Sequence, residues 1–122
     1  MKYMALIYGD RSRWERFSDE EREAAYDEYR AFGEEATKAG VALGGAELGP
    51  TGDATTVRIR EGETLVTDGP YAEVKEALGG FYLLECASLD EALEWAARIP
   101  GAEHGAVEVR ALYVDDQGSD AA

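Results

Sequence analysis

The hydrophobic and polar positions along the chain follow one period typical of strands and another typical of helices. Short apolar runs at residues 2–8 and 81–86 predict buried strands, because each has strand length and is bounded by turn residues. Residues 106–114 alternate between apolar and polar side chains, as a half-exposed strand does. A weaker apolar segment at 41–48, interrupted by glycines, predicts one further strand.

Two other segments carry apolar residues at spacings of three and four, which predicts amphipathic helices over about 19–39 and 89–99. Each segment begins with the capping-box pattern S-x-x-E, in which a serine and a glutamate satisfy the free amides of the first helical turn. The two boxes start at Ser18 and Ser88. Gly40 ends the first helix and a Pro-Gly pair ends the second.

The remaining segments are turns, a loop and a hairpin. Residues 56–60 and 64–67 read as a β-hairpin, because an alternating strand is followed by Glu-Gly and a returning strand. Residues 10–17 are expected to form a polar loop, and residues 71–78 could form a helical turn.

Without the hairpin, the predicted order is β-α-β-β-α-β, the ferredoxin-like pattern of an α+β fold with both helices on one face of an antiparallel sheet. We expect a single domain over 1–114 and an acidic tail at 115–122. The strands at 2–8 and 81–84 are apolar on both sides, so the sheet face without helices also needs cover. A second copy could provide it, which predicts a homodimer with two-fold symmetry and sheets packed face to face.

Composition excludes some classes of binding partner and indicates the cellular compartment. The chain has 122 residues, with 12 Lys and Arg against 26 Asp and Glu, so its net charge is −14. This charge argues against nucleic acid and anionic membranes as partners, and no apolar run reaches the length of a membrane span. The N-terminus lacks the pattern of a signal peptide, and the single cysteine excludes an internal disulfide, so we expect a cytoplasmic protein.

A longer motif then appears around Asp68. Residues 66–76 read V-T-D-G-P-Y-A-E-V-K-E, and residues 78–83 read L-G-G-F-Y-L. This string resembles the DGPF branch of the YCII-related proteins, with Tyr71 where the family usually has Phe and Val74 where it usually has Thr. Further similarity lies in L-D-E-A-L at 89–93 and in G-A-V-E-V-R at 105–110.

The resemblance implies a dimeric α+β barrel and says less about activity. Some members are encoded beside extracytoplasmic-function sigma factors, which implies an accessory role in regulation. A shorter branch has a proposed catalytic His–Asp pair, and one relative removes chloride from a chlorinated muconate-type acid. Asp68 matches the Asp of that pair, but residues 2–8 hold no His, so the pair does not carry over to this chain.

The candidate charged residues each have a functional and a structural interpretation. Asp68 could be a general base or substrate anchor, although Asp-Gly-Pro is also ordinary turn chemistry. Lys75 could bind an acidic substrate or join ion pairs in a surface loop. Arg110 could hold a carboxylate, since its guanidinium is bidentate, or pair with Glu108 at a dimer rim.

The candidate aromatic residues lie at strand ends and in loops near the sheet edge, where a pocket could open: Tyr8, Trp14, Tyr71 and Tyr82. Tyr82 could also donate a proton. The helical spacing of Tyr26 and Tyr29 favours the core. The single histidine, His104, is expected to be exposed in a loop, and Cys86 to be a buried, inert thiol.

Three hypotheses for function remain. The first is a small homodimeric binding or accessory domain with a small-molecule pocket near Asp68. The second is a cofactor-free enzyme of the isomerase or lyase type acting on a small acidic or aromatic metabolite, with Asp68 as base, Tyr82 as acid and Arg110 or Lys75 as the anion holder. The third is a purely structural interaction domain. No nucleotide, serine-hydrolase or zinc motif occurs, so we expect no cofactor and no metal.

Overall fold

The computed structural model describes residues 1–113 as an α+β fold, and the expected acidic tail at 115–122 lies outside the described residues. The strands and helices, in chain order, are β1 (Lys2–Asp10), α1 (Arg11–Glu15), α2 (Asp19–Lys38), β2 (Ala42–Glu47), β3 (Thr55–Arg60), β4 (Glu63–Asp68), β5 (Glu76–Glu85), α3 (Leu89–Ala96) and β6 (Ala106–Ala111). Short 3-10 turns, η1 (Thr51–Asp53) and η2 (Pro100–Glu103), precede β3 and β6. None of the helices within 1–113 is both long and apolar enough to cross a membrane.

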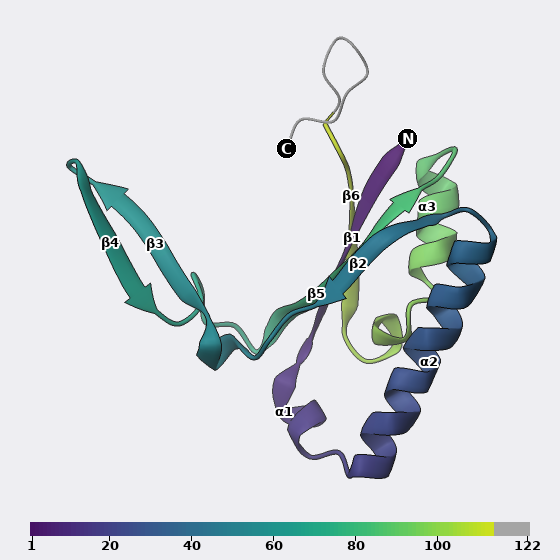
Figure 1. Cartoon of the computed structure of the whole chain (residues 1–122), viewed down its shortest axis with the longest axis horizontal. Coiled ribbons are helices and arrows are strands. Elements are labelled where there is room, and N and C mark those ends of the chain that lie inside the picture. Colours follow the sequence, from purple (N-terminus) through teal and green to yellow (C-terminus); the bar gives the residue numbers. More distant parts are fainter. Residues whose placement is uncertain (114–122) are drawn as a thin grey trace.

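The main sheet is antiparallel and four-stranded, with the order β2-β5-β1-β6. The two apolar strands, β1 and β5, are therefore central, with Met4 opposite Leu83 and Leu6 opposite Phe81. Both long helices, α2 and α3, lie on one side of this sheet (Figure 1). The arrangement is compatible with a ferredoxin-like fold, as the sequence predicts.

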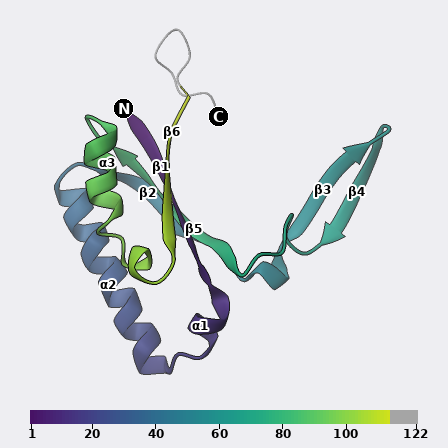
Figure 2. The ribbon, with the colours of Figure 1, turned by 180° about the vertical axis from the view of Figure 1, so that it is seen from behind.

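The core lies between the sheet and the two long helices. Small side chains on each helix, Ala36 on α2 and Ala92 on α3, are fully buried, so the helices approach the sheet closely. They pack near Ala5 of β1 and Leu84 of β5, which are also fully buried. The opposite face of the sheet carries half-buried apolar side chains from β1 and β5, namely Met4, Leu6, Phe81 and Leu83, and we call it the bare sheet face. Within residues 1–113 no helix covers this face (Figure 2).

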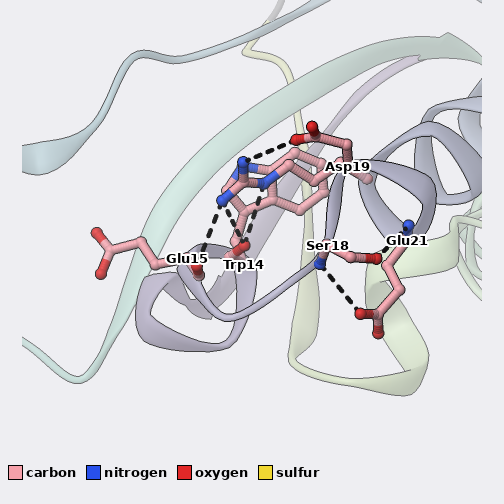
Figure 3. Close-up of polar contacts among 6 residues, drawn as sticks. Trp14, Glu15, Ser18, Asp19 and Glu21 are labelled. Atoms are coloured by element: carbon pink, nitrogen blue, oxygen red, sulfur yellow. Dashed lines mark hydrogen bonds and ion pairs between the residues drawn. The ribbon is translucent and has the colours of Figure 1, made fainter.

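Both long helices begin where the sequence predicts. Ser18 accepts from the amide of Glu21 at 3.1 Å, and the Glu21 carboxylate accepts from the amide of Ser18 at 3.0 Å, which completes a capping box (Figure 3). Ser88 caps α3 by accepting from the amide of Glu91 at 3.2 Å. The Glu91 carboxylate accepts from the amide of Ala87 rather than from that of Ser88, so the second predicted box is only half formed. The helix predicted over 89–99, α3, ends at Ala96 rather than at residue 99, because Pro100 holds the preceding Ile99 in an extended conformation.

Two expectations about the loops are wrong. The segment 10–17 is not all loop, because residues 11–15 form α1, with Asp10 accepting from the amide of Ser12 at 2.9 Å. Residues 71–78 form no helical turn, because β5 already begins at Glu76 and pairs there with Asp10. Backbone pairing with β1 outweighs the local helical preference of this segment.

The predicted hairpin is confirmed, and β3 and β4 form a separate two-stranded sheet that projects from the body of the molecule (Figure 1). Its two turn residues, Glu61 and Gly62, both have positive φ, as a tight two-residue hairpin turn requires. At the other end, the Gly69 amide donates to the Ala54 carbonyl at 2.7 Å and closes the base.

Candidate functional site

A cavity of about 580 Å³ opens beside the last residues of β1 and the first half of β5, where these strands meet α1, the first half of α2 and η2. Its lining is rich in aromatic residues, which are Tyr8, Trp14, Phe17, Tyr26, Tyr29 and Tyr82. A concave, mainly apolar site with a few polar groups is the usual form of a small-molecule pocket.

The short helix α1 forms one wall because α2 holds it in place. The Arg22 guanidinium, on α2, donates to the last carbonyls of α1, those of Trp14 at 3.4 Å and Glu15 at 3.3 Å (Figure 3). These bonds satisfy carbonyls that the helix itself leaves free. The Trp14 ring meets Tyr26 edge to face, with centroids 5.3 Å apart, so the wall is continued by α2.

The sheet side of the cavity carries Tyr82 of β5 and, facing it from α2, Tyr29. Burial raises the pKa of Tyr82, and the neighbouring Tyr29 adds to this shift. Burial also raises the pKa of Tyr29, and a hydrogen bond from the Gly101 backbone opposes that effect only in part. Both phenols therefore stay protonated at neutral pH and can donate a hydrogen bond inside the cavity.

Glycines keep the backbone walls of the cavity thin. A Cβ at Gly80 would lie 2.8 Å from the Ala46 carbonyl oxygen, and one at Gly105 would overlap with the carbonyl oxygen of Tyr8. Both glycines line the cavity, so close backbone contact here fixes its shape.

Most carboxylates of the lining already have a donor within the chain. Asp10 accepts from the Ser12 amide and hydroxyl, and these bonds lower its pKa. Glu21 belongs to the capping box of α2, and the hydrogen bonds with Ser18 lower its pKa as well. Glu47, at the end of β2, accepts from the Tyr26 hydroxyl at 3.2 Å. These bonds fix the carboxylates as parts of the wall.

The structure brings three of the sequence-predicted site residues together: Tyr8, Trp14 and Tyr82 all line the cavity. Asp68 and Arg110 lie elsewhere in the chain. Asp68 is exposed at the end of β4, opposite Thr55 in the hairpin. Arg110 lies on β6 with its guanidinium 4.0 Å from Glu108, beside Met4 of the bare sheet face.

Two further predicted residues lie in the connection between β4 and β5. The Tyr71 ring is 77% exposed and lies under the Arg58 guanidinium, 4.9 Å away. Lys75 is exposed but close enough to Asp10 to favour the ionised carboxylate. This connection therefore runs past the rim of the cavity without lining it.

Sequence reasoning missed part of the site. Arg11 falls in the segment expected to be a loop, and it lines the cavity. The assignment of Tyr26 to the core is wrong, because Tyr26 is 40% exposed and faces the cavity from α2. Its three-residue spacing from Tyr29, near the start of a long helix, is the signal that could have placed both rings on one cavity wall.

The single histidine and the single cysteine lie where the sequence predicts. His104 is exposed, as expected, at the rim of the cavity and 3.9 Å from Glu103. Cys86 is buried, as expected, and burial raises the pKa of its thiol. Across residues 1–113, no cluster of three His, Cys, Asp or Glu side chains could hold a metal ion.

Comparison with known proteins gives two matches. A family model described as YCII-related domain matches residues 1–114. An uncharacterized protein of Rhizobium meliloti (strain 1021) is 45% identical over 120 residues, which cover 97% of each chain.

Proposed function

We propose that this chain, which belongs to the YCII-related domain family, binds a small aromatic molecule in the cavity between α1, α2 and the sheet. The observation that carries the proposal is a cavity of about 580 Å³ walled by aromatic rings. Offset or edge-to-face contacts with these rings would hold a flat ligand. The protonated phenol of Tyr82 would orient it.

The cavity adjoins the motif that the sequence singled out. Thr51 lines the cavity and belongs to η1, which leads into the hairpin that ends in Asp68. On the return path Lys75 lies near Asp10 at the cavity rim. This proximity supports a role of the Asp-Gly-Pro segment next to the pocket, in keeping with a DGPF-branch member.

The binding proposal is tested by calorimetric titration with flat aromatic compounds such as indole and naphthalene derivatives. Ala25, on α2, lines the cavity, so Ala25→Phe should fill it and weaken binding by about tenfold or more, which is at least 1.4 kcal/mol. Ala31→Phe is the matched control, since Ala31 is exposed on the same helix away from the cavity. Equal affinity in the two variants, or no binding to the unmodified protein at millimolar concentration, contradicts the proposal.

The proposal extends to the assembly. The bare sheet face is apolar and would be covered by the same face of a second copy, giving a homodimer with ferredoxin-like halves and a dimeric α+β barrel. Residues 1–114 would then be one domain of that dimer. We also propose a cytoplasmic location, supported by the buried single Cys86, and an accessory role beside a sigma factor, supported by the family resemblance alone.

A second candidate is a cofactor-free enzyme that moves a proton on a small acidic or aromatic metabolite. The observation that favours it is the protonated Tyr82 phenol inside the cavity, which could act as an acid. Asp68 would be its base and Lys75 or Arg110 its anion holder, and these side chains would have to come from a second copy, because within one chain they lie outside the cavity. Exchange of ligand C–H for deuterium, followed by NMR, distinguishes the two candidates: an enzyme catalyses it and loses it in Asp68→Asn.

A further inference from the structure

One cation of the cavity has a buried donor without a partner among the described residues. Arg11 lines the cavity, and its Nε is buried without a hydrogen-bond partner among residues 1–113. Within the same residues no carboxylate comes close enough to Arg11 to form an ion pair. An unpaired guanidinium with a buried donor is costly, so an acceptor from outside the chain would stabilise it.

The neighbouring groups cannot fill that role in the observed arrangement. Asp10 and Glu21 accept hydrogen bonds from serines, and Glu47 accepts from Tyr26. Arg13, the other arginine of the lining, lies over the Phe17 ring at 4.8 Å. The buried side-chain atom without a partner among residues 1–113 is therefore a donor, the Nε of Arg11.

From these contacts we infer that the ligand is an aromatic carboxylate, with its ring among Trp14, Tyr26 and Tyr82 and its carboxylate on Arg11. The inference rests on the proposed function, since it names the ligand class of the same cavity. A guanidinium binds a carboxylate through two parallel, charge-assisted hydrogen bonds. An aromatic amine would meet an unpaired positive charge at the same place.

The net charge of −14 does not decide against an anion. Charges on the outer surface act through water and are screened beyond about 8 Å at physiological salt. A ligand inside the cavity responds mainly to the groups that touch it. Arg11 is the cation there that has a buried donor without a partner among the described residues.

The test compares three compounds of nearly the same shape: 2-naphthoate, 2-naphthamide and 2-naphthylmethylammonium. Calorimetry is carried out on the unmodified protein and on Arg11→Gln. Arg30→Gln is the matched control, because it removes one positive charge from α2 outside the cavity, where Arg30 pairs with Asp27. We expect naphthoate to bind at least tenfold more tightly than naphthamide in the unmodified protein and in Arg30→Gln. In Arg11→Gln the two affinities should be equal within about twofold.

A second variant at the same position separates the loss of the guanidinium from a disturbance of the fold. Arg11→Lys keeps the charge but loses the bidentate fork, so the preference for naphthoate should fall only in part. Equal binding of naphthoate and naphthamide to the unmodified protein, or a preference for the ammonium compound, overturns the carboxylate assignment and leaves the binding cavity standing. Binding of none of the three overturns both proposals.

Discussion

At Gly105 the chain has no room for a side chain. A Cβ there would overlap with the carbonyl oxygen of Tyr8, which belongs to the neighbouring strand β1. Backbone atoms cannot yield as a flexible side chain can. The identity of this one residue thus fixes how closely the loop after η2 approaches the end of β1.

We expect Gly105→Ala to lower the free energy of unfolding by about 1–3 kcal/mol, because the added methyl group forces the strand and the loop apart. Gly33→Ala is the control, since a Cβ at Gly33 meets no heavy atom within 4 Å outside its own helix. That change should raise stability by about 0.5–1 kcal/mol, as alanine is favoured over glycine within α2. Urea denaturation of the two variants measures both effects, and a loss of the same size in both would contradict the steric account.

Single residues also show how far a sequence can predict a site. Tyr8, Trp14 and Tyr82 were found because they lie at strand ends and in a loop, where pockets form. Arg11 could not be found in this way, since nothing in the sequence shows that its Nε lacks a partner. Tyr26 was assigned to the core because periodicity gives the inward face of a helix but not how far the helix extends beyond the sheet.

At the scale of elements, the start of α2 connects stability to the cavity. Its capping box fixes the first turn, and Arg22 in the second turn holds the carbonyls of Trp14 and Glu15. The same few residues therefore begin the helix and position the aromatic wall.

Ser18→Ala should lower the free energy of unfolding by about 1 kcal/mol, because the Glu21 amide loses its hydrogen-bond acceptor, the hydroxyl of Ser18. Thr37→Ala, at an exposed position in the last part of α2, should change stability by less than about 0.5 kcal/mol. Thermal or urea denaturation gives both values. An equal change in the two variants would show that the capping bonds contribute nothing.

The elements themselves differ in how well sequence predicts them. The existence and the starts of α2 and α3, and the two apolar central strands, agree with the prediction because their patterns extend over many residues, whereas the end of α3 and the start of β5 differ from it. The helix α1 has only five residues, too few for a period to appear. Residues 76–78, the start of β5, differ from the predicted helical turn because they pair with β1, as Leu78 does with Tyr8. Local sequence does not contain this long-range pairing.

For the whole molecule, the bare sheet face sets the expected assembly. Leu6 lies near its centre, opposite Phe81 on one side and Glu108 on the other. Light scattering should give twice the mass of one chain at micromolar concentration. Leu6→Lys should give a folded monomer, since a charge in an apolar interface is costly.

Val57→Lys is the control for that experiment. Val57 lies on β3 of the projecting hairpin and is 60% exposed, so a lysine there adds the same charge away from the bare sheet face. We expect this variant to keep the mass of the unmodified protein. A monomeric unmodified protein would contradict the dimer, and a dimeric Leu6→Lys would place the interface elsewhere.

The closed base of the hairpin has a consequence for engineering. The Gly69 amide meets the Ala54 carbonyl, so the chain leaves the body and returns to it at nearly the same point. A segment whose two ends lie close together can be replaced or lengthened without changing the path of the backbone on either side. Residues 55–68 could therefore be replaced by a tight turn, or extended to display a peptide or a dye, while the sheet and the cavity keep their course.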